Sequence, residues 1–395
     1  MGLNELASGE RIHIAFFGMR NAGKSSVVNA LTGLDLSVVS DVKGTTTDPV
    51  KRSMELLPLG PVVIIDTPGI DDEGELGLKR VEKTKQIIAQ TDIAVLVVDA
   101  TIGLSDLDKD VLSTFEARKL PCVLVYNKSD LLSEIPSVDK AVHAVYVSAK
   151  TLFGINSLKE VLGSFAASIK PEKHLVADLV KPNSTVILVI PIDESAPKGR
   201  LIMPQQIAIR DLLDNHCIPV CCQVNELKAV LDNLKKSPAL VITDSQAFKA
   251  VAEIVPDNLL LTSFSILMAR YKGELQPLTD GAAAMKKLKD GDKVLIAEGC
   301  VHHRQCNDIG SKKIPSWLEK YTGAKPEYVF ASGNDFPSDL SGFKLIIHCG
   351  GCMLNEAEMK NRIVRARESG VPIVNYGMAI ARFNGILSRS LQCLR

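Results

Sequence analysis

The sequence predicts an α/β protein of three successive domains, a larger one with a doubly wound, mostly parallel sheet and then two smaller α/β domains. Short apolar strands alternate with helix-forming segments, and several strands in the first third end directly in glycine-rich or polar motifs. A charged stretch with two prolines at residues 168–184 separates this third from the rest, and a chain of 395 residues is too long for one typical core. We expect boundaries at 1–170, 171–270 and 271–395.

Composition narrows the class of protein. The chain has 46 Lys and Arg against 46 Asp and Glu, and a formal net charge of zero argues against a general binder of nucleic acids or membrane surfaces. Its apolar runs stay well below the roughly 20 residues that cross a bilayer, and residues 1–11 lack the apolar stretch of a signal peptide. We therefore expect a cytoplasmic protein whose nine cysteines are thiols or metal ligands rather than disulfides.

The first motif is a phosphate-binding loop. An apolar strand at residues 12–17 runs into GMRNAGKSS at 18–26, which matches GxxxxGK(S/T) in the strand–loop–helix context that the motif requires. Lys24 would reach the outer phosphates, and the Ser25 hydroxyl would complete a Mg²⁺ shell. The residues expected to hold the nucleotide here are Gly18, Asn21, Ala22, Gly23, Lys24, Ser25 and Ser26.

Two further motifs would surround the γ-phosphate. Thr45 and Thr46 lie in a threonine-rich segment that predicts a first switch loop, and the apolar strand at 62–65 ends in DTPG at 66–69. Asp66 and Thr46 would help to hold Mg²⁺, and the Gly69 amide would sense the γ-phosphate. We expect the catalytic residues to be Lys24, Thr46, Asp66 and Gly69.

The last two motifs select the base. The strand at 122–126 ends in Asn127, Lys128, Ser129 and Asp130, and the Asp130 carboxylate can accept two hydrogen bonds from guanine that adenine cannot supply. Ser148, Ala149 and Lys150 follow another strand and would pack against the base. Five motifs in this order, each at the carboxyl end of a strand, predict a P-loop GTPase domain that binds GTP and Mg²⁺.

This domain resembles the TrmE/Era group of GTPases over about residues 10–168, in its NAGKSS loop, its threonine-rich switch and DTPGI at 66–70. The resemblance implies that Asn21 helps to bind a potassium ion beside the phosphates, where a cation can replace an arginine finger. Ile70 stands where many GTPases have a glutamine that orients water. We therefore expect slow hydrolysis that potassium stimulates.

Residues 171–270 predict a structural or association domain. Strands near 185–190, 218–223 and 239–243 alternate with helices near 205–215 and 226–235, with no catalytic constellation. Cys217, Cys221 and Cys222 lie there, and adjacent cysteines in a strand point to opposite faces. We interpret these cysteines as buried thiols rather than metal ligands.

The third domain carries a candidate metal site. A strand at 293–297 leads to Cys300 and His302, and a strand at 343–347 leads to HCGGC at 348–352. If these strands are parallel neighbours, their cysteines meet where open α/β sheets place ligands, and glycine amides can donate to sulfur. Three thiolates can hold an iron–sulfur cluster and leave one iron without a cysteine. Zinc bound by three cysteines and His302 or His348 is the alternative.

CxH followed about 45 residues later by HCxxC, behind a TrmE-like GTPase, resembles the HydF family of [FeFe]-hydrogenase maturation factors over the whole chain. The resemblance implies a GTPase, a dimerisation and a cluster-binding domain, which together form a scaffold or carrier for the diiron subcluster of the hydrogenase. It implies as partners a second copy of the chain in a homodimer or higher oligomer, radical-SAM maturases and the apo-hydrogenase.

The same resemblance assigns the metal ligands. Cys300, Cys349 and Cys352 match the three cysteines of a [4Fe–4S] cluster. The fourth position varies in the family, so its candidates are His302, His348, Glu298 and Asp308; Cys306 is an extra thiol with no assigned place. The competing interpretation is a TrmE/Era-like GTPase of RNA modification or ribosome assembly with a zinc-stabilised C-terminal domain, although the sequence has no basic, aromatic-interleaved stretch for RNA.

Overall fold

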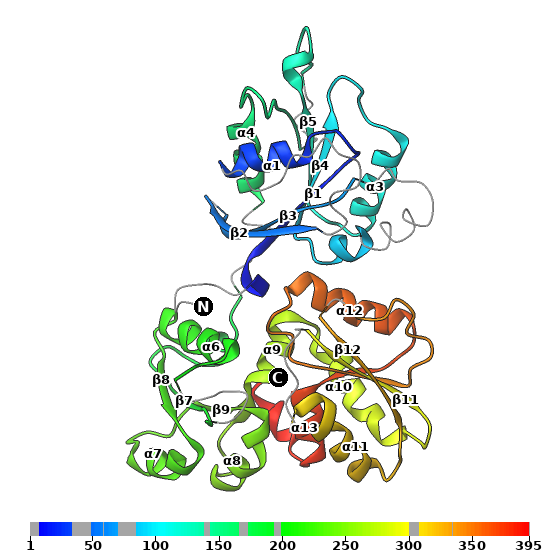
Figure 1. Ribbon diagram of the computed structural model, residues 1–395. Helices are drawn as coiled ribbons and strands as arrows, with labels where there is room; N and C mark the ends of the chain where they lie inside the picture. Colours follow the sequence, from blue (N-terminus) through cyan, green and yellow to red (C-terminus); the bar gives the residue numbers. More distant parts are fainter. Residues whose placement is uncertain are drawn as a thin grey trace. The chain divides into compact units, whose positions relative to one another are not determined.

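The computed structural model describes residues 8–33, 49–57, 59–69, 84–137, 143–165, 173–192, 199–299, 308–333 and 335–394. The chain divides into two compact units, Met1–Pro171 and Glu172–Arg395. The first unit has one sheet and the second has two (Figure 1), and each unit has hydrophobic cores of its own.

The first unit is built on a six-stranded sheet with the order β2-β3-β1-β4-β5-β6, in which only β2 pairs antiparallel to its neighbour. The strands are β1 (Ile12–Phe17), β2 (Val50–Leu56), β3 (Gly60–Asp66), β4 (Ile93–Asp99), β5 (Cys122–Asn127) and β6 (Ala144–Tyr146). The helices are α1 (Lys24–Thr32), α3 (Asp106–Ala117) and α4 (Ile155–Ser164), with short turns η1 (Ser8–Glu10) and η2 (Ser129–Leu131).

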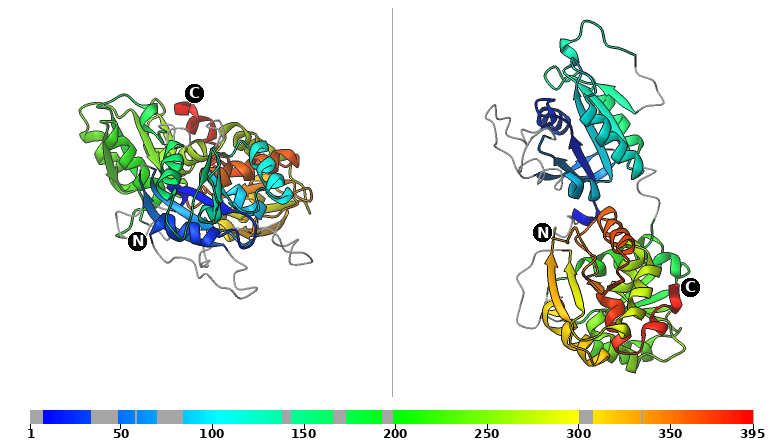
Figure 2. Two further views of the ribbon diagram at one scale, coloured as in Figure 1. Left: turned by 90° about the horizontal axis from the view of Figure 1, so that it is seen from above. Right: turned by 90° about the vertical axis from the view of Figure 1, so that its right-hand side faces the viewer.

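Helices cover both faces of this sheet, which explains why its central strands β1 and β4 are buried and almost entirely apolar. Ile14 and Phe16 of β1 pack with α1 and α4, whereas Ala15 and Phe17 pack into a second core with Phe115 of α3. In the right-hand view of Figure 2, α1 in dark blue and α3 in cyan lie on opposite sides of the sheet. The predicted doubly wound, mostly parallel sheet is confirmed.

The second unit contains two four-stranded sheets in which all pairings are parallel. One has the order β10-β9-β7-β8 and consists of β7 (Thr185–Val189), β8 (Ile218–Cys222), β9 (Leu240–Thr243) and β10 (Leu261–Ser263). The other has the order β12-β11-β13-β14 and consists of β11 (Lys293–Glu298), β12 (Glu327–Ser332), β13 (Leu345–His348) and β14 (Ile373–Asn375).

Helices connect these strands and join the two sheets into one unit. They are α6 (Met203–Asp214), α7 (Leu227–Asn233), α8 (Phe248–Ile254), α9 (Phe264–Lys272), α10 (Leu275–Ala284), α11 (Ile314–Thr322), α12 (Glu356–Glu368), α13 (Tyr376–Phe383) and α14 (Leu387–Ser390). Short 3₁₀-helices are η3 (Ala177–Leu179), η4 (Val224–Glu226), η5 (Ser245–Ala247), η6 (Met285–Lys287) and η8 (Gln392–Leu394), and η7 (Ile309–Lys313) is a π-helix. Helices α9 and α13 lie between the sheets in Figure 1, and one core joins Val241 to Ile347.

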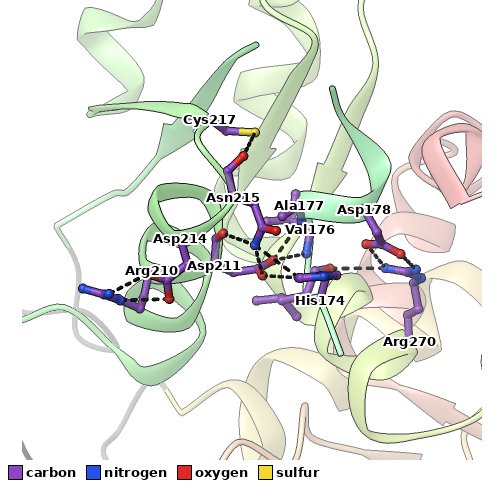
Figure 3. A network of polar contacts seen from close by, with 11 residues as sticks. His174, Val176, Ala177, Asp178, Arg210, Asp211, Asp214, Asn215, Cys217 and Arg270 are labelled. Carbon is purple, nitrogen blue, oxygen red and sulfur yellow. Dashed lines mark hydrogen bonds and ion pairs between the residues drawn. The ribbon is translucent and has the colours of Figure 1, made fainter. Parts of the chain in front are cut away.

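The chain enters the second unit through a segment that is held by the Asp211 carboxylate of α6. Oδ2 of Asp211 accepts hydrogen bonds of 2.8 Å from the amides of both Val176 and Ala177, and Oδ1 lies 2.9 Å from Nδ1 of His174 (Figure 3). Asp178 then forms an ion pair with Arg270 of α9. These contacts fix the start of the unit against α6 and α9.

Candidate functional site

The phosphate-binding loop lies between β1 and α1, as the motif predicts. Gly23 has φ +87°, and a Cβ there would lie 2.3 Å from Nδ2 of Asn127, so this position requires glycine. Nζ of Lys24 donates to the carbonyl oxygens of Gly18 at 3.0 Å and Met19 at 2.8 Å. The ammonium group therefore already lies over the loop that would surround the phosphates.

Two of the three predicted magnesium ligands are in contact, Ser25 in the first turn of α1 and Asp66 at the end of β3. The Ser25 hydroxyl donates a 2.6 Å hydrogen bond to Oδ2 of Asp66, and the Thr67 hydroxyl fixes the following turn through the carbonyl of Phe16 at 2.7 Å. A hydroxyl beside a carboxylate is an arrangement of hard oxygen ligands that suits Mg²⁺. Gly69 ends the described part of this segment, and Thr45, Thr46 and Ile70 lie outside it.

The base-recognition motif is joined to the phosphate loop through Asn127. Its Nδ2 donates to the carbonyl of Ala22 at 3.0 Å, and its Oδ1 accepts from the amide of Ala149 at 3.1 Å. The Ser148 hydroxyl donates to Oδ1 of Asp130 at 2.6 Å and orients that carboxylate. The structure thus brings the phosphate-binding loop, the base motif and the Ser148–Lys150 motif together. Of the other predicted residues, Asn21 lies in the loop, Ser26 in the first turn of α1 and Lys150 in an exposed turn after β6.

The sequence did not reveal a role for Asp99, which ends β4. Its Oδ2 lies 2.6 Å from Nζ of Lys128, and its Oδ1 accepts hydrogen bonds from the amide and hydroxyl of Thr101. Burial opposes ionisation of Asp99, but the hydrogen bonds from Lys128 and Thr101 leave its pKa below the usual value. The ion pair fixes Lys128, which has φ +64°, beside the base motif.

The two strands that lead to the cysteines are parallel neighbours, as expected. Ala297 of β11 is in register with His348 of β13, and the amide of Cys349 donates to the carbonyl of Ala297 at 2.9 Å. The sulfur of Cys349 accepts hydrogen bonds from the amides of Gly299 at 3.0 Å and Gly351 at 3.4 Å. Two amide donors favour the thiolate form that metals bind.

His348 is fully buried beside Cys349. Its Nδ1 lies 2.7 Å from the carbonyl oxygen of Cys349, and its Nε2 lies 3.0 Å from Nη1 of Arg362. These partners correspond to a neutral ring that donates from Nδ1 and accepts at Nε2. Burial and the charge of Arg362 lower the pKa of His348 to about 3. Both ring nitrogens are therefore engaged within the protein.

Acidic groups and a tyrosine lie around the same two strand ends. The hydroxyl of Tyr376 donates to Oε1 of Glu298 at 3.3 Å, and both side chains are buried. Burial, followed by the charges of Cys349 and Glu298, raises the pKa of Tyr376 well above its usual value, so the phenol remains protonated. Oδ2 of Asp308 accepts from the amide and hydroxyl of Ser311 at 2.8 and 2.9 Å.

The third predicted thiol lies outside the described residues, together with His302 and Cys306. Among the described residues, which do not include Cys300, no group of three His, Cys, Asp or Glu side chains is placed to hold a metal ion. Gly299, which directly precedes Cys300 in the sequence, is the last described residue of this segment. The amide contact of Gly299 with Cys349 therefore places the residue before Cys300 beside another of the predicted cysteine ligands.

The other cysteines differ partly from expectation. Cys217 and Cys222 are buried, but Cys221 is exposed, so the interpretation of all three as buried thiols is wrong for Cys221. β8 is the edge strand of its sheet, and the outward face of an edge strand has less cover than the inward face.

Within the described residues, no helix is long and apolar enough to span a membrane.

Comparisons with known families cover most of the chain. A model of the hydrogen maturase F dimerization domain matches residues 175–273, a model of the hydrogen maturase F tetramerization domain matches residues 276–393, and a 50S ribosome-binding GTPase model matches residues 13–128. The three matches follow one another in the order GTPase, dimerization and tetramerization.

Curated relatives match the GTPase part. GTPase Der of Kosmotoga olearia is 34% identical over 177 residues, which cover 40% of each chain. The tRNA modification GTPase MnmE of Herminiimonas arsenicoxydans is 34% identical over 180 residues, 42% of this chain and 38% of the relative. The chain thus spans about 40% of the length of these relatives. A solved structure of Era with MgGDPNP and 16S ribosomal RNA covers 60% of the chain at 20% identity and a TM-score of 0.36.

Proposed function

The chain belongs to the hydrogen maturase F (HydF) family, and from this premise we propose that it is a GTP-hydrolysing scaffold or carrier for the diiron subcluster of [FeFe]-hydrogenase. It would hold a [4Fe–4S] cluster through Cys300, Cys349 and Cys352. The observation that carries the proposal is the hydrogen bond from the Gly299 amide to the sulfur of Cys349, because it joins the two strand ends that bear these cysteines.

The described residues fit such a cluster. Amide donors at 3.0 and 3.4 Å from Sγ of Cys349 match the hydrogen bonding that stabilises cluster sulfur and tunes its potential. Gly351 has φ +65°, which permits the sharp turn between Cys349 and Cys352. When bound through three cysteines, the cluster would supply one iron without a thiolate, to which an incoming group can bind.

For the fourth ligand we favour Glu298 over His348. Both nitrogens of His348 are bonded within the protein, and ligation would require breaking the contact with Arg362 or that with the Cys349 carbonyl. Glu298 ends β11, next to Gly299, and its carboxylate is buried against the Tyr376 hydroxyl. A carboxylate binds iron less tightly than thiolate, which suits a position that must exchange. His302 and Asp308 remain the competing ligands.

The GTPase domain would act as a nucleotide-dependent switch for the cluster-binding part of the chain. GTP and Mg²⁺ are bound by the P-loop GTPase domain, and we propose that Asn21 adds a potassium ion beside the phosphates. The chain forms homo-oligomers, because its second and third segments match dimerization and tetramerization domains. Loading by radical-SAM maturases in the cytoplasm and transfer to the apo-hydrogenase belong to the proposal.

A transfer experiment tests the proposed function. The full chain would be purified anaerobically from cells that also make the radical-SAM maturases and then mixed with apo-[FeFe]-hydrogenase. We expect hydrogen evolution from the native chain and none from Cys349→Ala. Hydrogen evolution no greater than with buffer alone would contradict the carrier role. A zinc-stabilised GTPase acting on RNA is disfavoured, since the segment after the GTPase matches maturase domains.

A further inference from the structure

Two buried cations hold the loop that carries Cys349 and Cys352. The first is Lys272, the last residue of α9, whose side chain is almost fully buried. Its Nζ donates to the carbonyl oxygen of Leu354 at 2.7 Å and to that of Cys352 at 3.2 Å. An ammonium group removed from water is costly, and it is retained where its donors bind polar groups in the protein.

The second cation is Arg362 of α12, which is 1% exposed. Its Nη1 lies 3.0 Å from Nε2 of His348, its Nη2 donates to the carbonyl of Gly333 at 2.6 Å, and its Nε donates to Oε1 of Glu358 at 2.7 Å. The guanidinium also lies 4.9 Å from the ring centre of Phe336. One side chain thus joins the residue before Cys349 to the segment after β12.

These contacts bracket the cysteine loop at both ends. Arg362 contacts the ring of His348, and Lys272 donates to the carbonyl oxygens of Cys352 and Leu354. The geometry points to Lys272 and Arg362 as positioning residues, which fix the loop so that Cys349 and Cys352 present their sulfurs to one cluster. This inference rests on the proposed function.

The two cations also come from different parts of the chain. α9 lies in the segment that matches the dimerization domain, whereas α12 lies in the segment that matches the tetramerization domain. The cysteine loop is therefore held from both segments. Because reduction adds negative charge to a cluster, nearby positive charge also raises its reduction potential.

Methionine substitutions test the inference, because methionine preserves much of the side-chain length and removes the charge. Arg270→Met on α9 and Arg365→Met on α12 are the matched controls. Arg270 pairs with Asp178 (Figure 3), and Arg365 lies over the Phe336 ring but donates to carbonyls of the 337–338 segment. Lys272→Arg and Arg362→Lys keep the charge but alter the donor geometry, and native-like Trp317 fluorescence verifies that each variant is folded.

Two readouts separate the inference from the proposed function. In cluster-free full-length protein, mass spectrometry would follow alkylation of each cysteine; we expect Cys352 to react faster in Lys272→Met and Cys349 faster in Arg362→Met. After anaerobic reconstitution, iron affinity should fall by about tenfold or more. The cluster that remains bound in these methionine variants should have a lower reduction potential than the cluster of the native chain. Both controls should behave as the native chain does.

The outcomes are distinct. Native alkylation rates, iron content and potential in both methionine variants would overturn the positioning role. If Lys272→Arg and Arg362→Lys restore the potential but not the iron affinity, charge and geometry contribute separately, as inferred. Absence of iron from the native chain would contradict the proposed function, and the alkylation rates of cluster-free protein would still decide whether the cations position the loop.

Discussion

The backbone amide of Gly299 donates a hydrogen bond to Sγ of Cys349 across 3.0 Å. This contact joins the end of β11 to the turn after β13, although the two residues are 50 positions apart in the chain. Parallel pairing of the two strands makes it possible, because the carboxyl ends of parallel neighbours meet at one edge of a sheet. The cluster assignment and its predictions follow from this junction.

Nucleotide specificity should depend on Asp130. Ser148 holds one oxygen of its carboxylate, which would accept hydrogen bonds from guanine. Asp130→Asn should lower turnover of GTP and raise that of XTP, with a change in relative kcat/KM of about a hundredfold or more. Xanthine presents a carbonyl where guanine has an amine, and the new amide can donate to it. An unchanged preference for GTP would contradict the role of Asp130.

Potassium should stimulate GTP hydrolysis. Asn21 lies in the phosphate loop with φ +61°, and its side-chain oxygen would ligate a monovalent cation that stabilises transition-state charge. We expect turnover about tenfold or more faster in potassium chloride than in equimolar sodium chloride. Asn21→Ala should lose the difference, and Asn21→Asp, which keeps an oxygen, should retain it. Equal rates for the native chain in the two salts would exclude the cation role.

The iron that no cysteine binds should exchange its ligand, and Glu298 should control that exchange. Glu298→Gln removes the carboxylate with little change in shape, so added imidazole or cyanide should perturb the EPR spectrum of the reduced cluster at lower concentration than in the native chain. Asp308→Asn is the control, since Oδ2 of Asp308 already accepts from the Ser311 amide and hydroxyl. A larger effect of Asp308→Asn than of Glu298→Gln would assign the ligand to Asp308.

Alkaline pH should destabilise the second unit through Cys222. Burial raises the pKa of this thiol from 9.0 to about 11. Between these values the folded chain keeps the proton and the unfolded chain loses it, so the free energy of unfolding falls as pH rises through this range. Denaturation followed by Trp317 fluorescence at pH 8 and pH 10.5 should show a smaller loss for Cys222→Ala than for the native chain. An identical loss in both would contradict this titration.

Local motifs were predictable because each chemistry requires particular residues at fixed spacing. The phosphate loop around Gly23 and the base motif at Asp130 lie where the sequence placed them, at the carboxyl ends of apolar strands. The two strands that lead to the cysteine site were predictable for another reason, since parallel strands that are buried on both faces form near-continuous apolar runs.

Long-range partners could not be predicted. Lys272 meets Cys352 across 80 residues of sequence, and Lys128 meets Asp99 across 29, with no local pattern that marks either pair. His348 resembled a ligand because it stands beside Cys349. The ring of His348 is fully buried, however, and meets Arg362 of α12, a partner that no local pattern marks.

The most direct test of the account is the metal content of the chain after anaerobic reconstitution with iron and sulfide. The native protein should bind about four iron and four sulfide per chain and give an EPR signal on reduction. Cys300→Ala, Cys349→Ala and Cys352→Ala should each lose the cluster while GTP turnover persists, because the nucleotide motifs lie in the other unit. Stoichiometric zinc without iron in protein made under iron-replete anaerobic conditions would contradict the cluster assignment.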